Sequence, residues 1–261
     1  MLHSPLINVM VKAARKAARG LVRDFGEVEN LQVSRKGPAD FVTAADRKSE
    51  EVLHDELSFA RPDFGFLMEE SGVIEGKDPT HRWIIDPLDG TTNFIHAIPH
   101  FAISIAVERD TTIIAGLVYN PISDDMFLAE RGRGASLNGQ RIRVSARSRL
   151  EEALLACGMP FKGKGDPVQF TAEQNRLIDQ VSGIRRYGAA ALDLSWVAAG
   201  RFEGFWERGL AAWDVAAGAL VLKEAGGQVT DLDGRENWLS GGTILGTNDT
   251  LHTEVLKLLR G

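Results

Sequence analysis

The stretch of sequence that decides the fold spans residues 83–94 and reads Trp83-Ile84-Ile85-Asp86-Pro87-Leu88-Asp89-Gly90-Thr91-Thr92-Asn93-Phe94. Its apolar start predicts a buried strand that delivers Asp86 at its carboxyl end, then a Pro-directed turn that presents Asp89, then the start of a helix. Carboxylate and carbonyl oxygens ligate Mg²⁺, and free backbone N–H groups at a helix N-terminus favour phosphate oxygens. An ordinary strand–turn–helix connection would show the same pattern, so the rest of the chain has to decide.

Length and composition bound the class of protein. The chain has 261 residues and is 44% apolar, which is ordinary for a globular enzyme with one large domain or two lobes that share a core. A formal net charge of −6 argues against a dedicated nucleic-acid surface, which normally needs a basic excess. No apolar run reaches the roughly 18 residues that cross a bilayer. We therefore expect a soluble protein without a membrane partner.

The only cysteine, Cys157, permits no intrachain disulfide and favours a reducing compartment, so we expect a cytoplasmic protein. Apolar and small residues flank it, which is typical of a small buried side chain at the end of a strand. No basic neighbour in the sequence would lower its pKa, so a catalytic thiol is disfavoured.

The N-terminal segment, residues 5–25, predicts a helix with basic side chains, a pattern that transit peptides and membrane-surface helices also show. Its apolar residues recur with a helical period that suits packing on a core. They are Leu6, Val9, Met10, Ala13, Ala17, Leu21 and Val22. We favour the core-facing interpretation, because the small residues suit close packing and no cleavage-site pattern follows.

An acidic residue also opens the next predicted helix. Thr43 is a plausible N-cap, and Asp46 occupies the third helical position of a helix that continues to about Phe59. An acid in a first turn complements the helix dipole without any further role, and the residues alone favour that interpretation.

A second strand is predicted to end in carboxylates. Residues 64–68 form the predicted strand, and Glu69 and Glu70 follow it. Open sheets collect their ligands at the carboxyl ends of strands, so these acids are candidates to join Asp86 and Asp89. A solvated acidic turn before a polar connector is the alternative.

Antiparallel strands are predicted over residues 101–108, 112–119 and 126–129. Arginines then recur from residue 131 to residue 149 around the hairpin signal Asn138-Gly139. An anion or RNA contact is conceivable there, but aromatic residues are absent and acids flank the run. A solvated hairpin is favoured.

The second half alternates predicted strands and helices: strand 153–157, helix 168–181, strand 183–187, helix 189–199, strand 204–206 and helix 212–225. This order predicts an α/β lobe, residues 150–261, that completes the site. Residues 1–149 form an α+β lobe with most of the candidate ligands. Asp214 opens the last helix, where it either caps the helix or joins the other acids in a cleft between the lobes.

The chain resembles the inositol monophosphatase family, and more narrowly its bacterial members. Three separated motifs carry the resemblance in order: Glu69-Glu70-Ser71, Asp86-Pro87-Leu88-Asp89-Gly90-Thr91 and Trp213-Asp214-Val215-Ala216-Ala217-Gly218. The resemblance implies a layered αβαβα sugar-phosphatase sandwich, usually a homodimer. It also implies hydrolysis of small sugar or polyol phosphates, most of all myo-inositol monophosphate, with Mg²⁺ as cofactor at two or three ions per subunit, and sensitivity to lithium.

The resemblance also implies roles for individual residues. The first metal would be held by Glu69, Asp86 and the carbonyl of Leu88, and the second by Asp86, Asp89 and Asp214. The attacking water would be oriented by Glu69, helped by Thr91 and Asp46, and Lys36 would lie near the metals. Substrate would contact Asp89, Asp214, the backbone amides of Gly90 and Thr91, and, at the polyol, Ala190 and Glu207.

The chain departs from the family pattern at two positions, of which the first bears on substrate preference and the second on local packing. Ala189 stands where relatives often carry Ser or Thr, and Met68 precedes Glu69 where many have Gly. Rival substrates are fructose bisphosphate, histidinol phosphate and a 3′-phosphonucleotide, and Glu207 favours a polyol over a nucleotide. A rival of another class is a binding protein that acts on the transcription machinery through the basic first helix and the arginine run. Clustered carboxylates without a cation would repel one another, which argues against a purely structural role.

Overall fold

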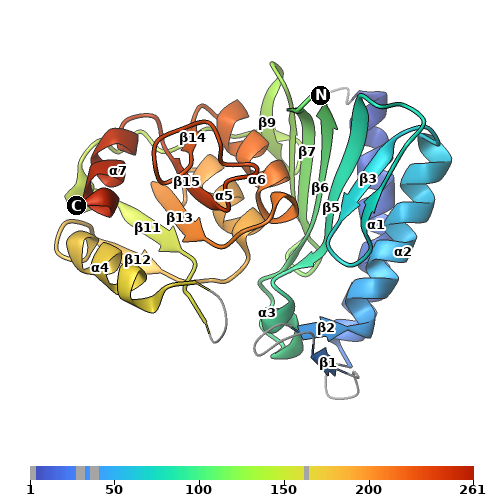
Figure 1. The fold of residues 1–261 in the computed structure, drawn as a ribbon, viewed down its shortest axis with the longest axis horizontal. Helices are drawn as coiled ribbons and strands as arrows, with labels where there is room; N and C mark the ends of the chain where they lie inside the picture. The colour runs from blue at the N-terminus through green and yellow to red at the C-terminus, as the bar shows by residue number, and fades with distance from the viewer. Residues whose placement is uncertain (1–3, 28–32, 36–40, 162–164) are drawn as a thin grey trace.

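The computed structural model describes residues 4–27, 33–35, 41–161 and 165–261. Within these residues, two large mixed sheets alternate with three pairs of helices, so that helices cover both faces of each sheet (Figure 1). The expected layered αβαβα sandwich is therefore confirmed.

The first sheet has eight strands in the order β10-β9-β8-β7-β6-β5-β3-β4. The bounds are β3 Gly65–Met68, β4 Gly72–Ile74, β5 His81–Asp89, β6 Ala102–Arg109, β7 Thr112–Asn120, β8 Asp125–Glu130, β9 Gly134–Leu137 and β10 Gln140–Arg141. Only β3 and β5 pair in parallel. The central strands β5 and β6 are buried along most of their length, because helices pack on both faces, and this explains their continuous apolar runs.

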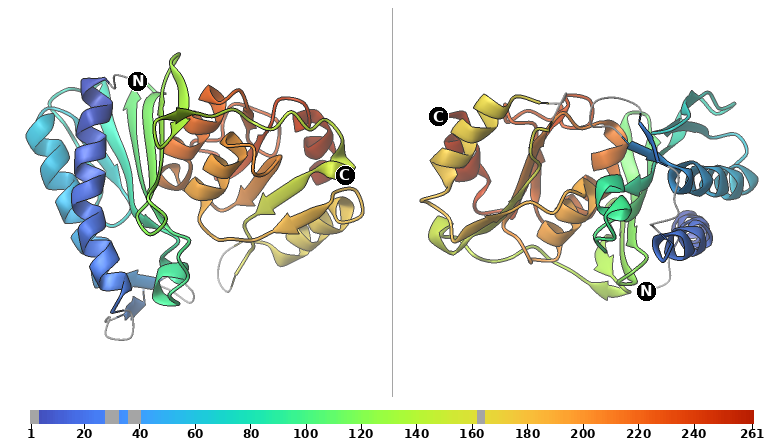
Figure 2. Two further views of the ribbon diagram at one scale, coloured as in Figure 1. Left: turned by 180° about the vertical axis from the view of Figure 1, so that it is seen from behind. Right: turned by 90° about the horizontal axis from the view of Figure 1, so that it is seen from below.

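The outer layer consists of α1 (Pro5–Phe25) and α2 (Ala44–Ala60), which lie side by side on one face of this sheet (Figure 2). Ser4 caps α1 by accepting a hydrogen bond from Ile7 N, and Pro5 follows it at the first helical position. The core-facing interpretation of α1 is confirmed, although Val22 is exposed. Lys12 and Lys16 on α1 both form ion pairs with Glu56 of α2.

The central layer consists of α5 (Ala190–Ala198) and α6 (Ala212–Glu224), which pack between the two sheets. Residues 215–222 of α6 are all buried, because this helix contacts protein on every side. Gly218 lets the two helices approach closely: a Cβ at this position would lie 2.9 Å from the Cβ of Leu194 on α5.

The second sheet has five strands in the order β12-β11-β13-β15-β14, with α4 (Pro167–Leu177) and α7 (His252–Arg260) on its outer face. Its strands are β11 Leu154–Cys157, β12 Gly183–Arg185, β13 Gly204–Arg208, β14 Gln228–Thr230 and β15 Thr243–Thr247. β11 pairs in parallel with β12 and β13, and β15 is antiparallel to both of its neighbours.

Several element boundaries differ from the sequence predictions. β5 continues through Asp89 instead of ending at Asp86, because both residues pair with β6 across an irregularity in register. α4 ends at Leu177 rather than at residue 181, and β12 ends at Arg185 rather than at residue 187. The elements that were not expected are β2 (Phe41–Thr43), β4, a 3₁₀ turn over Leu150–Glu152, and β14, β15 and α7 at the end of the chain. The helix predicted to start after Asp89 is α3 (Thr91–Ile95), which has a single turn.

A further short strand, β1 (Val33–Arg35), pairs antiparallel with β2. None of the helices in the described part of the chain is both long and apolar enough to span a bilayer.

Candidate active site

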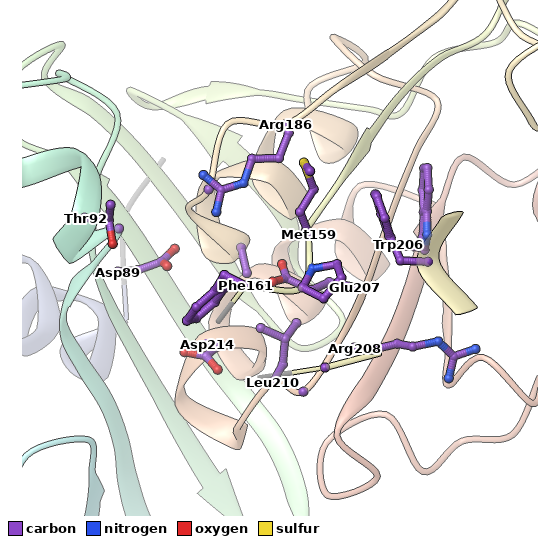
Figure 3. Close-up of a pocket in the computed structure, with 18 of the residues that line it drawn as sticks. Asp89, Thr92, Met159, Phe161, Arg186, Trp206, Glu207, Arg208, Leu210 and Asp214 are labelled. Atoms are coloured by element: carbon purple, nitrogen blue, oxygen red, sulfur yellow. The ribbon is translucent and has the colours of Figure 1, made fainter. Parts of the chain in front are cut away.

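A cavity of about 190 Å³ lies between the end of β5, the start of α6 and the ends of β11 and β13. Asp89 and Thr92 line one side, Asp214 lies below, Arg186 lies above, and Glu207 lies toward the small sheet (Figure 3). The walls therefore come from both sheets, so neither half of the chain forms this cavity alone.

The end of β5 supplies a tightly bonded acidic segment. Asp86 is buried, and its Oδ1 accepts a hydrogen bond from Leu88 N at 2.9 Å. The carbonyl of Leu88 accepts the hydroxyl of Thr91 at 3.0 Å, which leaves that oxygen a second lone pair. Ser49 on α2 donates to the carbonyl of Pro87 at 3.0 Å. These bonds hold the irregular segment between Asp86 and Asp89 in one conformation.

Asp89 connects this segment to the central helices. Its Oδ2 accepts a hydrogen bond from Ala191 N, 2.8 Å away and on α5. Ala189 occupies the N-cap position of α5 and has no hydroxyl to satisfy that amide. Asp89 therefore caps a helix that begins a hundred residues later in the chain.

Asp214 combines the two interpretations that the sequence left open. Its Oδ2 accepts a hydrogen bond from Ala211 N at 2.6 Å, so it caps α6 from within the first turn. It also lines the cavity, and its negative charge raises the pKa values of Glu69, Asp86 and Asp89. Asp214 therefore caps α6 and also belongs to the acidic cluster.

Glu69 reaches the cluster because β3 lies beside β5. Its backbone N–H donates to the carbonyl of Ile85, at 3.2 Å, as the last bond of the parallel ladder. Burial, followed by the charges of Asp214 and Asp46, raises the pKa of Glu69 to about 8. Asp46, buried in the first turn of α2, is therefore close enough to act on this carboxyl.

Glu70, the other acid after β3, has different neighbours. Its carboxylate lies 3.8 Å from Arg47, and its backbone N–H donates to the buried Glu50. These contacts give Glu70 a structural part in the turn from β3 to β4.

Burial and mutual repulsion raise the pKa values of the acids in the site. Burial is the largest cause that raises the pKa of Asp86, and the charges of Glu69 and Asp89 raise it further. Burial and Asp214 do the same for Asp89. A protein that keeps several carboxylates close together in a buried place either protonates them or neutralises them with cations.

The donor set fits a hard divalent cation. It consists of carboxylate oxygens and one backbone carbonyl, which are the ligands of Mg²⁺. Among the residues that the structure describes, no group of three or more acidic, histidine or cysteine side chains is arranged to hold an ion. The fit therefore rests on the chemistry of the donor set and not on a preformed arrangement of ligands.

The remaining predicted contacts lie around the cavity. Gly90, Thr91, Ala190 and Glu207 all line it. Gly90 has a left-handed φ of 92°, and a Cβ there would lie 3.0 Å from the carbonyl oxygen of His100, so glycine is required. Lys36, expected near the metals, lies outside the described residues.

Sequence reasoning missed several residues of the site. Arg186 lines the cavity, and its charge opposes the rise in the pKa of Glu207. Its position near the end of the predicted strand 183–187 was the available signal. His100 and Asp193 are both buried, with 3.6 Å between Nε2 and Oδ1, and the charge of Asp193 raises the pKa of Asp89 and of Glu207. Nothing in the local sequence pointed to that pair, because His100 and Asp193 come from distant segments of the chain.

Two other sequence features are structural. Cys157 is buried, and burial raises the pKa of its thiol to about 12, which agrees with the expected inert side chain.

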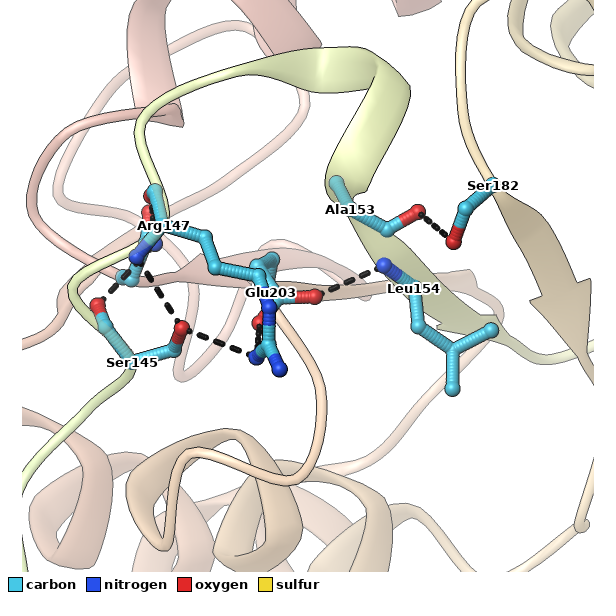
Figure 4. Close-up of polar contacts among 7 residues, drawn as sticks. Ser145, Arg147, Ala153, Leu154, Ser182 and Glu203 are labelled. Atoms are coloured by element: carbon cyan, nitrogen blue, oxygen red, sulfur yellow. Dashed lines mark hydrogen bonds and ion pairs between the residues drawn. The ribbon is translucent and has the colours of Figure 1, made fainter.

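In the arginine run, Arg147 forms an ion pair with the buried Glu203 at 2.8 Å (Figure 4). The other oxygen of Glu203 accepts Leu154 N at 2.7 Å. Arg147 therefore stabilises the segment that connects the two sheets.

Comparison with known proteins gives a consistent family. A family model described as "Inositol monophosphatase family" matches residues 2–261. An "Inositol-1-monophosphatase" from Mesorhizobium japonicum is 54% identical over 260 residues, which cover 100% of this chain and 98% of the relative. A "Nus factor SuhB" from Escherichia coli (strain K12) is 42% identical over 256 residues, or 98% of this chain and 96% of that protein.

A solved structure extends the comparison to the fold. The structure of "extragenic suppressor protein suhB" from Bartonella henselae is 54% identical to this chain, with a TM-score of 0.96. The match covers 98% of this chain and 99% of the solved chain.

Proposed function

The chain belongs to the inositol monophosphatase family and is a phosphatase of phosphate monoesters, and from this we propose that its substrate is a small polyol phosphate, with inositol monophosphate the first candidate. The observation that carries the proposal is the gathering of Asp89, Asp214 and Glu207 around one cavity. A carboxylate next to a phosphate site can accept the hydroxyls of a polyol.

We propose Mg²⁺ as the cofactor, at two or three ions per subunit. Glu69, Asp86 and the carbonyl of Leu88 would hold the first ion, and Asp86, Asp89 and Asp214 would hold the second. When bound, the ions would supply positive charge for the phosphate and a water of lowered pKa. The support is the chemistry of the donor set and the mutual repulsion of the carboxylates.

The protein groups have separate tasks in this proposal. Glu69, assisted by Thr91 and Asp46, orients the water that attacks phosphorus. The backbone N–H groups of Gly90 and Thr91 donate to the phosphate oxygens. Glu207 and Ala190 contact the polyol, and Lys36 belongs to the same site by family resemblance.

Domain organisation, assembly and location are further proposals. We propose lobes at residues 1–149 and 150–261, since the strands of each large sheet come from one side of that boundary. We propose a homodimer, supported by exposed apolar side chains such as Ile98, Val73 and Ile74. A cytoplasmic location is supported by the single, buried cysteine. Light scattering on the purified protein would measure the assembly.

A second role in transcription is a candidate, because a 42% identical relative carries the name Nus factor. The exposed arginines between residues 131 and 149 are the part of this chain that supports it. Size-exclusion chromatography with purified RNA polymerase tests the role, and the role is refuted if the two proteins elute separately at low salt.

The main test is turnover of a panel of phosphate esters after removal of metal, with and without added Mg²⁺. The panel contains inositol 1-phosphate, fructose 1,6-bisphosphate, histidinol phosphate and a 3′-phosphonucleotide. We expect Mg²⁺-dependent release of phosphate, fastest with the inositol ester. If another ester is hydrolysed faster, that ester replaces inositol 1-phosphate as the proposed substrate. Activity without any divalent cation would refute the proposal that Mg²⁺ is the cofactor.

We also propose lithium sensitivity, with Asp89 and Asp214 at the position that admits the ion. An all-oxygen pocket can take a small hard monovalent cation. Steady-state rates at several lithium concentrations, with sodium to match ionic strength, should show inhibition that is not competitive with substrate. Insensitivity at about 10–100 mM, far above typical substrate constants, would contradict the proposed position.

A further inference from the structure

Gly158 directly follows β11 and lies beside Glu207 of the adjacent parallel strand β13. Cys157 at the end of β11 pairs with Trp206 on β13, and Gly158 N donates to the carbonyl of Trp206 at 3.0 Å. Residues at neighbouring positions of adjacent strands point to the same face, about 4.8 Å apart. The side chain of Glu207 therefore extends over the position where residue 158 would carry its own.

The space above Gly158 is filled by the carboxyl group of Glu207. A Cβ on residue 158 would lie 1.8 Å from Cδ of Glu207 and 2.1 Å and 2.2 Å from its two oxygens. Distances this short do not occur for real Cβ atoms, so any other residue would displace the carboxyl group. Gly158 is not among the glycines with positive φ, so its backbone could accept alanine. The obstacle to a side chain here is the carboxyl group of Glu207, the end of a flexible side chain that would have to move.

Little else fixes the carboxyl group of Glu207. It forms no hydrogen bond within the described part of the chain, and Asp214, Asp193 and Asp89 are the acidic neighbours that raise its pKa after burial. Arg186 is the charge that opposes them. Contact with the bare backbone of Gly158 therefore determines where this flexible side chain can rest.

We propose that Gly158 determines substrate specificity as a positioning residue: its missing side chain lets the Glu207 carboxyl group lie beside the cavity, where it receives the hydroxyls of a polyol substrate. The inference rests on the proposed function, since it concerns the same cavity. Gly158 also lines the cavity, but the proposed role is exerted through the position of Glu207.

The test compares two esters in the wild-type protein and in Gly158→Ala. Inositol 1-phosphate carries hydroxyls for Glu207, whereas 4-nitrophenyl phosphate carries none. We expect kcat/KM for the inositol ester to fall about tenfold or more, mainly through KM, because a charged hydrogen bond is lost. The aryl ester should be hydrolysed at nearly the wild-type rate. Gly20→Ala, on α1 where a Cβ meets nothing within 4 Å, is the matched control and should change neither value.

A double variant separates action through Glu207 from general distortion. In a Glu207→Ala background the obstructing carboxyl group is gone, so adding Gly158→Ala should cause no further loss with the inositol ester. Gly158→Ala should also lower the midpoint of thermal unfolding in the wild-type background but not in the Glu207→Ala background.

The outcomes distinguish this inference from the proposed function. Equal losses with both esters, or a further loss in the Glu207→Ala background, would overturn the role of Gly158. If the wild-type protein hydrolysed neither ester, the proposed function would fail, and the thermal comparison would still decide whether Gly158 positions Glu207.

Discussion

Asp89 is the residue at which the fold and the chemistry depend on the same atoms. One carboxylate oxygen caps α5 through Ala191 N, and the charge belongs to the acidic cluster. Asparagine at this position would keep an oxygen that accepts the amide but would lose the charge. The two roles of the side chain can therefore be separated by a single substitution.

We predict that Asp89→Asn abolishes hydrolysis while the protein still folds. Loss of one charge should weaken cation binding, and the metal-free protein should be at least as stable as the wild type because repulsion is relieved. Turnover at saturating Mg²⁺ and thermal unfolding in EDTA measure the two effects. Asp89→Ala, which also removes the cap, is the comparison and should cost roughly 0.5–2 kcal/mol of stability. Near wild-type turnover in Asp89→Asn would refute the assignment to the metal site.

Glu207 lines the cavity from the β13 side and is assigned to the substrate hydroxyls. We predict that Glu207→Ala changes discrimination between esters more than chemistry. The inositol ester should lose about 1.5–3 kcal/mol of transition-state stabilisation, the usual value for a hydrogen bond to a charged group. The measurement is the ratio of kcat/KM for inositol 1-phosphate to that for an aryl phosphate. An unchanged ratio would remove Glu207 from substrate recognition.

At the scale of elements, the approach of α5 to α6 positions the donor that Asp89 needs. Gly218 on α6 faces α5, where an added Cβ would lie 2.9 Å from Leu194 Cβ and 3.0 Å from the carbonyl oxygen of Ala191. Helices cross this closely only where one of them lacks a side chain. The position of Ala191, and with it the cap that Asp89 supplies, follows from this contact.

We predict that Gly218→Ala destabilises the protein. Overpacking of a close contact costs about 1–3 kcal/mol, which outweighs the roughly 1 kcal/mol that alanine contributes to helix propensity. Denaturant unfolding measures the difference. Gly20→Ala in α1 has the same propensity gain and open space, so it should be stabilising. If both variants were equally stabilised, the proposed tight packing of α5 on α6 would be wrong.

At the scale of the whole molecule, the buried acids couple folding to pH and to cations. Burial and neighbouring acids raise the pKa of Glu69 from its usual 4.5 to about 8. Between these values the folded protein holds a proton that the unfolded chain has released, so stability falls as pH rises through the window and is not regained above it. Cations bind the ionised carboxylates and should reverse the loss.

We predict that the metal-free protein unfolds at a lower temperature near pH 8 than near pH 5, and that Mg²⁺ reduces this difference. Thermal unfolding in EDTA and in Mg²⁺ across this range is the measurement. Glu69→Gln lacks the titrating group and should show a weaker dependence on pH without metal. An identical dependence in Glu69→Gln and wild type would show that Glu69 does not carry the effect.

The sequence by itself determined the type and order of most elements. The periodicity of residues 5–25, the apolar run before Asp86 and the Asn138-Gly139 turn each depend on neighbours within one element, and the structure confirms all three. The separated acidic motifs also sufficed to predict the family, because their chemistry and order can be read without coordinates.

Only the tertiary structure decided how those residues meet. β5 extends through Asp89 because β6 pairs with it, and Asp89 caps α5 because Ala189 has no hydroxyl to do so. Gly158 and Glu207 are in contact although they lie 49 positions apart in the chain. Local propensity carries no information about such pairs, since they are created by strand register and helix packing between segments that are distant in the sequence.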